Sequence, residues 1–212
     1  MPSSYVNVYS FIYDGAMPRR KQVPDSDVLD VALDVLHAGG PQSLTFAALS
    51  EASGLAPATL VQRFGSKPDL LSRVLLHAWD RLERRTDELG ATVERTPRGA
   101  VAFLVGLSEQ YGGIDSYADA LLVLREDLRD PQARRRGTAW RASLAGVLDA
   151  CLDGPPGLGD AVATYWQGTL TWWGFDPREP VTTHVEQELT RFLATVLSPP
   201  AGSARAGTRT GP

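Results

Sequence analysis

The sequence has few of the features on which enzymes, membrane proteins and disulfide-linked domains depend. It contains one cysteine, Cys151, so no disulfide can form within the chain, as is usual for proteins of a reducing cytosol. No apolar run reaches the roughly 18 residues that a membrane-spanning helix requires. No G-x-S-x-G elbow, Walker A loop or G-x-G-x-x-G turn is present. These absences predict a cytoplasmic protein without a catalytic site, a cofactor or a membrane partner.

An excess of positive charge is also missing. The formal net charge is -4 at pH 7, so the chain as a whole is not a polycation that coats nucleic acid. Any contact with DNA must therefore come from a local patch. The three histidines, His37, His77 and His184, have no carboxylate or cysteine at metal-ligand spacing, so no metal site is expected. Cys151 itself is interpreted as a buried, small apolar residue.

Both ends of the chain differ in composition from the middle. Residues 1–24 are expected to be an extension followed by a basic arm with Arg19, Arg20 and Lys21. Met17 is a candidate natural start, and the alternative is a genuine but poorly ordered arm. Residues 198–212 (SPPAGSARAGTRTGP) are rich in Gly, Pro and small residues, which predicts a disordered tail.

Between these ends the apolar residues recur at helical spacing, and no alternating pattern of strand length stands out. Ser26 is expected to cap a first helix that Gly39–Gly40–Pro41 ends. The further helices expected are Phe46–Ala52, Pro57–Phe64, Lys67 to about Glu94, Pro97–Gln110, Ser116–Leu128, Pro131–Leu152, Gly159–Trp173 and Pro180–Leu197. The sequence thus predicts an all-α protein, with a three-helix domain over residues 25–70 and a larger helical domain over residues 71–197.

The most informative segment is TFAALSEASGLAPATLVQRF, residues 45–64. Two short helices joined by a turn that contains a glycine form the helix-turn-helix pattern. Thr45 can cap the first of these helices, and Gly54 stands where the chain reverses and a positive φ is favoured. The residues expected to face inward are Ala48, Leu49, Leu55, Leu60 and Phe64.

The outward face of the second helix has the chemistry of a DNA reader. Gln and Arg bond base edges, Thr bonds bases or phosphates, and Ala contacts a thymine methyl group. Lys67, at the start of the next helix, is placed to meet a phosphate, and the basic arm is able to reach a further phosphate or the minor groove. The outward residues are Pro57, Ala58, Thr59, Gln62 and Arg63. Similar helix pairs occur in helical proteins that do not touch DNA, so the pattern alone leaves DNA binding open.

Asp25–Leu76 resembles the N-terminal domain of the TetR family of bacterial transcriptional regulators. The likeness includes SLTFAALSEASGLAPATLVQRFGSKPDLLSRVL, with Thr45, Gly54, Thr59, Phe64 and Lys67 at matching spacing. It implies a three-helix DNA-binding domain and a larger helical domain that binds a small ligand and dimerises through its last two helices.

The resemblance also assigns residues to the DNA contact. It implies that Thr45 and Lys67 contact phosphates and that residues 57–63 form the recognition helix. Val61 departs from the family, which usually has Tyr there, so the phosphate contact of that hydroxyl is missing. Arg63 stands where His or Tyr is common and is a candidate to compensate for this loss.

The C-terminal part has no motif, and its assignments rest on aromatic content. Bundles of helices often hold a ligand cavity lined by aromatic residues, although aromatic side chains in a bundle are more often core. The pocket candidates are Phe103, Leu107, Tyr111, Leu121, Trp140, Leu144, Tyr165 and Trp166. Trp172, Trp173 and Phe175 are expected at a dimer interface, where Gly168 and Gly174 would permit close helix approach.

Together these features predict a ligand-responsive transcriptional regulator, a repressor that binds a roughly palindromic operator as a homodimer. A small, largely apolar molecule is expected to release it. The alternative is a helical small-molecule-binding or interaction protein whose helix-turn-helix has lost its competence for DNA. Two features favour that alternative: Val61 at the usual tyrosine position, and the small number of basic residues around the helix-turn-helix.

Overall fold

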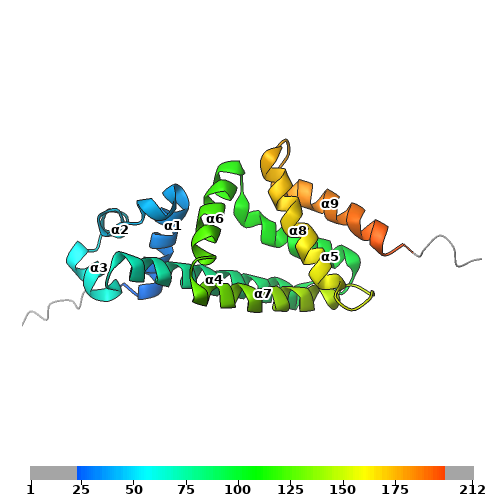
Figure 1. Cartoon of the computed structure of the whole chain (residues 1–212), viewed down its shortest axis with the longest axis horizontal. Coiled ribbons are helices and arrows are strands. Elements are labelled where there is room, and N and C mark those ends of the chain that lie inside the picture. The colour runs from blue at the N-terminus through cyan, green and yellow to red at the C-terminus, as the bar shows by residue number, and fades with distance from the viewer. Residues whose placement is uncertain (1–22, 199–212) are drawn as a thin grey trace, which may run out of the picture.

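The computed structural model describes residues 23–198, and this part of the chain is all-α, as predicted (Figure 1). One 3-10 turn, Glu109–Tyr111, accompanies the α-helices. The helices are α1 (Asp25–Ser43), α2 (Phe46–Ser53), α3 (Pro57–Phe64), α4 (Lys67–Thr92), α5 (Pro97–Ser108), α6 (Ile114–Asp127), α7 (Pro131–Asp149), α8 (Leu158–Phe175) and α9 (Val181–Val196).

The first helix corrects one expected cap. Helix α1 begins at Asp25 after Pro24, and Ser26 lies inside its first turn, where its hydroxyl donates to Asp27 Oδ1 at 3.0 Å. The predicted stop at the paired glycines appears as a break within α1. Gly40 has φ +68°, a left-handed conformation that other residues rarely adopt.

Two hydrophobic cores lie at opposite ends of the elongated molecule, and the 26-residue helix α4 runs from one into the other (Figure 1). The N-terminal core joins α1, α2, α3 and the first turns of α4 around fully buried Leu36, Leu49 and Leu60. The C-terminal core joins α5, α7, α8 and α9 around Phe103 and Trp166. Cys151 belongs to this second core and is buried, as expected.

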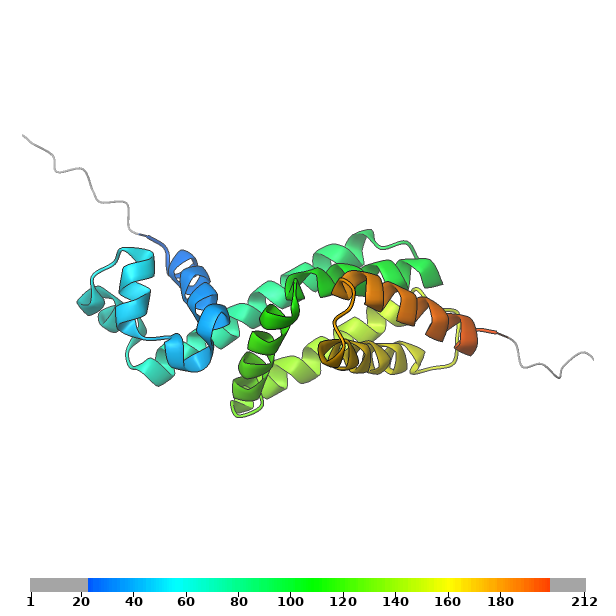
Figure 2. The same ribbon diagram turned by 90° about the horizontal axis from the view of Figure 1, so that it is seen from above.

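Helix α6 connects the two cores. It lies against α1 and also contacts α7 and α8, and both views place it between the ends of the molecule (Figures 1 and 2). Val123 of α6 is buried in the N-terminal core, and Tyr117 of the same helix is buried in the C-terminal core. The N-terminal core is therefore completed by a residue from far along the chain.

No helix of the described residues has the length and apolar content needed to cross a membrane. Within the same residues, no group of three His, Cys, Asp or Glu side chains is arranged to hold a metal ion.

Candidate DNA-binding surface and ligand sites

The turn between α2 and α3 has the geometry of a helix-turn-helix. Gly54 has φ +69°, as predicted, and its N–H donates to the Ser50 carbonyl at 2.9 Å. Two hydroxyls fix the turn further: Ser50 Oγ donates to the Leu55 carbonyl at 2.7 Å, and Ser53 Oγ donates to the Leu49 carbonyl at 2.6 Å. The role of both serines was not predicted, although serine hydroxyls near a turn commonly form hydrogen bonds with nearby backbone groups.

The predicted inner face of the helix pair is confirmed at its centre. Leu49, Leu60 and Phe64 are buried, while Ala48 and Leu55 are partly buried. Helix α3 begins at Pro57, whose missing N–H costs nothing in a first turn. Pro57, Ala58, Val61 and Gln62 are exposed and Thr59 is partly exposed, so the outer face of α3 is open at the end of the molecule, with Gln62 and Thr59 as its polar side chains.

Arg63 corrects the expected outward face of α3. Its side chain is only 14% exposed, because its guanidinium lies against the start of α1. Arg63 Nε donates to Asp25 Oδ1 at 2.8 Å, and its Nη2 donates to the Val23 carbonyl at 2.8 Å and to the same Asp25 oxygen. The arginine therefore ties the recognition helix to the residues just after the basic arm.

Arg73 of α4 completes this cluster. Its guanidinium donates to the Arg63 carbonyl at 2.8 Å and to Asp25 Oδ2 at 3.2 Å. The guanidinium carbons of Arg63 and Arg73 lie 5.6 and 5.0 Å from the centre of the Phe64 ring, within cation–π range. The hydrogen bonds from Arg63, opposed by partial burial, lower the pKa of Asp25. We call Asp25, Arg63 and Arg73 the Asp25 cluster.

The candidate phosphate contacts lie at helix starts. Thr45 Oγ1 accepts from Ala48 N at 3.1 Å, as predicted, and its hydroxyl hydrogen is left to donate to a phosphate. Lys67 Nζ is 3.4 Å from the Gln42 carbonyl and remains partly exposed. At the start of α4, Ser66 and Asp69 form a capping box, and the hydrogen bonds from Ser66 lower the pKa of Asp69. Arg19, Arg20 and Lys21 lie outside the described residues.

The predicted ligand pocket does not form a cavity around its candidates. Phe103, Leu107, Leu144 and Trp166 are buried and packed together in the C-terminal core. Trp166 Nε1 donates to the buried Ser108 hydroxyl at 2.9 Å, so its polar atom is also satisfied. Leu121 is 44% exposed on α6, on the outside of the bundle. Close packing of large side chains fills the space that was expected to hold a ligand.

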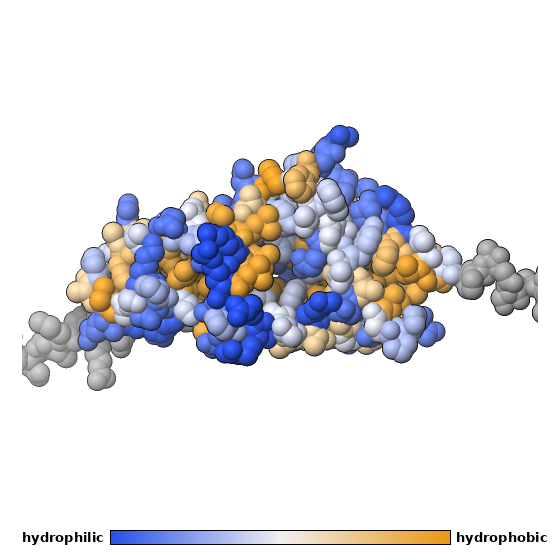
Figure 3. Space-filling model, in the orientation of Figure 1, coloured by the Kyte–Doolittle hydropathy of each residue, from blue (hydrophilic) through white to orange (hydrophobic). Residues whose placement is uncertain are grey.

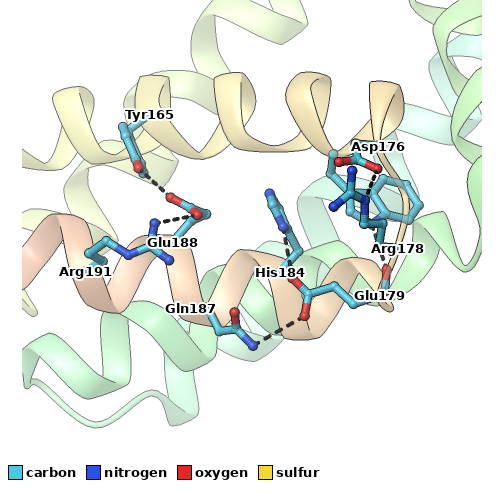
Figure 4. Close-up of polar contacts among 9 residues, drawn as sticks. Tyr165, Asp176, Arg178, Glu179, His184, Gln187, Glu188 and Arg191 are labelled. Carbon is cyan, nitrogen blue, oxygen red and sulfur yellow. Dashed lines mark hydrogen bonds and ion pairs between the residues drawn. The ribbon is translucent and has the colours of Figure 1, made fainter.

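The remaining three candidates also have protein partners. Trp140 Nε1 donates to Thr86 Oγ1 at 2.9 Å, and the Tyr111 ring meets the Tyr117 ring edge to face. Tyr165 stacks on Phe192 with ring centres 4.1 Å apart. Its hydroxyl donates to Glu188 Oε2 at 3.0 Å, one of the polar contacts between α8 and the segment that includes α9 (Figure 4).

The structure instead has an open groove of about 1050 Å³ between α4, α5 and α9. A smaller hollow of about 430 Å³ adjoins it and is lined in part by Phe103. Apart from Phe103, none of the pocket candidates lines either hollow. The residues that line the larger groove are Arg85, Leu89, Pro97, Arg98, Val101, Ala102, Val105, Gly106, Glu109, Glu186, Thr190, Leu193, Ala194, Leu197 and Ser198.

The three aromatic residues proposed for a dimer interface separate into two groups. Trp172 is 72% and Phe175 is 79% exposed, and their rings lie 5.7 Å apart at the end of α8. Trp173 is buried, and its Nε1 donates to the Glu179 carbonyl at 2.8 Å, so it cannot face a partner. Gly174 permits close packing within the chain, because a Cβ there would lie 2.9 Å from the Tyr117 ring.

A search of the curated proteins found no match, but the family and structure comparisons agree with this geometry. Residues 28–74 match the model of bacterial regulatory proteins of the tetR family. A transcriptional regulator from Saccharomonospora viridis, in complex with choline, is similar over 79% of this chain and 93% of its own, with a TM-score of 0.63 and 19% identity. A tetR-family regulator from Mesorhizobium loti is similar over 81% and 95%, with a TM-score of 0.60 and 16% identity.

A third similar structure is the TetR-family regulator PfmR from Thermus thermophilus, with a TM-score of 0.57 and 16% identity over 79% of this chain and 97% of that one. The fold is thus the one shared by these structures, with an N-terminal helix-turn-helix domain and a larger helical domain. Residues 28–74 match the TetR-family model, so the resemblance seen in Asp25–Leu76 is confirmed.

Proposed function

We propose that this chain is a repressor that binds a roughly palindromic operator as a homodimer and leaves it when a small molecule binds the C-terminal domain. The observation that carries the proposal is the exposed outer face of α3, which presents Gln62 and Thr59 from a helix-turn-helix at one end of the molecule. The similar structure that contains choline supports the idea that a helical domain of this kind accepts a small molecule.

The Asp25 cluster changes which residues we expect to read DNA. Gln62 and Thr59, with Ala58 and Pro57 beside them, are the side chains available on α3, since Arg63 is held by Asp25. We propose that Arg63 positions α3 relative to the arm, while Thr45 and Lys67 contact phosphates. A base contact by Gln62 would be worth about 1–3 kcal/mol of discrimination.

The proposal is tested by binding of the full-length protein to DNA from beside its own gene, followed across a salt series. Gln62→Ala is expected to reduce specific affinity by a factor of about 5–150 and to leave non-specific binding in place. Gln132→Ala, at an exposed position near the start of α7, is the matched control. If no sequence is selected from random DNA by a folded protein, the repressor proposal is wrong.

A second candidate function is a small-molecule-binding protein that no longer uses DNA. Two observations favour it: Val61 is 48% exposed where a tyrosine hydroxyl would otherwise meet a phosphate, and two arginines near α3 are paired with Asp25. This function predicts that Gln62→Ala and Lys67→Ala leave every activity of the protein unchanged.

Release by a ligand would require different affinities for two conformations and an element that transmits the change to the N-terminal domain. Helix α6 is suited to this. Trp79 Nε1 of α4 donates to its Asp127 at 3.2 Å, and its Leu122 lies against Gly40 of α1.

A further inference from the structure

The groove between α5 and α9 exists because small residues line its faces. The two helices run antiparallel (Figures 1 and 2), and Ala102 and Gly106 of α5 and Ala194 of α9 face the space between them. Val101 and Leu193 are buried beneath these small residues, so the floor is apolar and closed. The groove follows α5 for its twelve residues, which corresponds to about 18 Å of helix.

The two ends of this groove carry different charge. Arg98 lies at the start of α5 and has no ion-pair or hydrogen-bond partner among the described residues. At the other end, Glu109 is paired with Arg85 at 3.2 Å, and Glu186 lies beside this pair without a cation of its own. The groove is therefore elongated, apolar along its length, basic at one end and acidic at the other.

The smaller hollow strengthens the assignment of Arg98 as the polar end. It shares Leu89, Arg98 and Ala102 with the groove, so the guanidinium lies where the two hollows meet. Glu94 also lines this second space, so an anionic head group is expected to stay at Arg98 and not to extend into it. The positive end of the α5 dipole and the negative end of the α9 dipole both lie there, because the helices are antiparallel, so the charge of Arg98 makes this end basic.

We propose that this groove binds an elongated anionic amphiphile, with its acid group paired to Arg98 and its alkyl chain along Val101, Ala102 and Ala194. A cationic head is disfavoured at the Arg98 end. At the other end the carboxylate of Glu109 is already paired with Arg85, which leaves Glu186 as the one carboxylate there that could attract a cation. The volume is at the upper limit of typical ligand sites, about 300–1000 Å³. The role of this ligand as the releasing molecule rests on the proposed function, but its binding does not.

Calorimetric titration of the full chain with dodecanoate, below its micelle concentration, tests the site. We expect one molecule per chain. Arg98→Gln should weaken binding by about 10-fold or more, as loss of a charge-assisted hydrogen bond does. Arg84→Gln is the matched control, because Arg84 is exposed on α4 next to Arg85 and outside the groove. Ala102→Phe, which fills the groove from an exposed position, should abolish binding.

Three outcomes would overturn the proposal. Binding of dodecyltrimethylammonium as tight as that of dodecanoate would contradict the preference for an anionic ligand. Binding unaffected by Ala102→Phe, in a variant with unchanged circular dichroism and melting temperature, would place the ligand elsewhere. Absence of binding, together with a dimer that dissociates in the Ala102→Phe variant, would show that a second copy of the chain covers the groove.

The same titrations separate this proposal from the proposed function. Dodecanoate bound at Arg98 with no change in DNA affinity would support the groove and contradict ligand-controlled release. Loss of sequence-specific DNA binding in Gln62→Ala, with dodecanoate binding intact, would support both.

Discussion

At the scale of single residues, Asp25 is the most consequential position of the DNA-binding domain. One carboxylate holds Arg63 of α3 and Arg73 of α4, and both guanidinium groups lie near the ring of Phe64. The helical period predicted that Arg63 faces outward from α3. This prediction was wrong, because Asp25, 38 residues earlier, lies beside that position and holds the guanidinium. A pairing between separate helices depends on their packing, which a local pattern does not contain.

Asp25→Asn is expected to release Arg63 and Arg73 and to add one positive charge near the DNA. Binding should strengthen and the salt dependence should steepen by about one phosphate contact, which fluorescence anisotropy across a salt series would measure. The ion pairs are partly exposed, so the free energy of unfolding should fall by no more than about 1 kcal/mol.

Asp27→Asn is the control for this change. It alters the charge equally, two residues away, but the Asp27 carboxylate contacts only Ser26 in the described structure. An identical effect of both substitutions on the salt slope would show that net charge, and not release of Arg63, is responsible.

Because the folded-state pKa of Asp25 is lowered, its contribution to stability is present above the unfolded value and is lost as the pH falls below it. Acid should therefore free the two arginines in the wild-type protein.

At the scale of elements, the junction of α4 and α6 contains an unusual carboxyl group. Burial, aided by nearby Asp130, raises the pKa of Asp127 to about 6, while the hydrogen bond from Trp79 Nε1 opposes the rise. A raised pKa in the folded state means that the folded protein binds this proton more tightly than the unfolded chain. Stability from this group is therefore greatest at acid pH and falls as the pH rises from about 4 to 6.

Asp127→Asn should remove this loss of stability at higher pH. The amide oxygen can still accept from Trp79, so the free energy of unfolding at pH 8 should rise by about 1–2 kcal/mol after screening by solvent is allowed for. Urea unfolding of both proteins at pH 5 and pH 8 measures the difference. Asp87→Asn, on the exposed side of α4, should change nothing.

Most of the helices could be predicted at this scale. Thr45, Gly54 and Pro57 mark the beginning and end of short helices through local backbone chemistry, and α2 and α3 begin and end there in the structure.

The pocket could not be predicted in the same way. Trp166 and Phe103 are residue types that often line cavities. Whether such large side chains fill the space between helices or surround a cavity depends on the distance between the helices. The groove was missed because its signal, small residues on α5 and α9, requires knowing that these helices are neighbours.

At the scale of the whole molecule, apolar surface remains exposed on the C-terminal half. Figure 3 shows apolar side chains over α6, and the exposed residues there include Leu121, Leu124 and Leu128. Trp172 and Phe175 form a separate exposed pair at the end of α8. Aromatic side chains of this size bury about 150–250 Å² each in an interface, which makes the α8 pair the stronger candidate for a contact between two copies.

The double substitution of Trp172 and Phe175 by serine is expected to weaken dimerisation by a factor of about 150 or more, since each buried side chain is worth about 1.5–3 kcal/mol. Sedimentation velocity over a range of concentrations would measure it. Leu128→Ser removes an exposed apolar residue directly after α6 and should leave the dimer intact. The reverse result, a dimer sensitive only to Leu128, would move the interface to α6.

Val123 has a consequence for any attempt to exchange parts between regulators. It comes from α6, in the larger half of the molecule, yet it is buried in the core that supports α3. A fragment that ends after α4 would expose the surface that Val123 covers, and a transplanted DNA-binding domain would meet a foreign α6. New operator specificity is therefore more safely introduced by changing the exposed residues of α3 than by replacing the domain. The contact between the two parts of the molecule is itself part of a hydrophobic core.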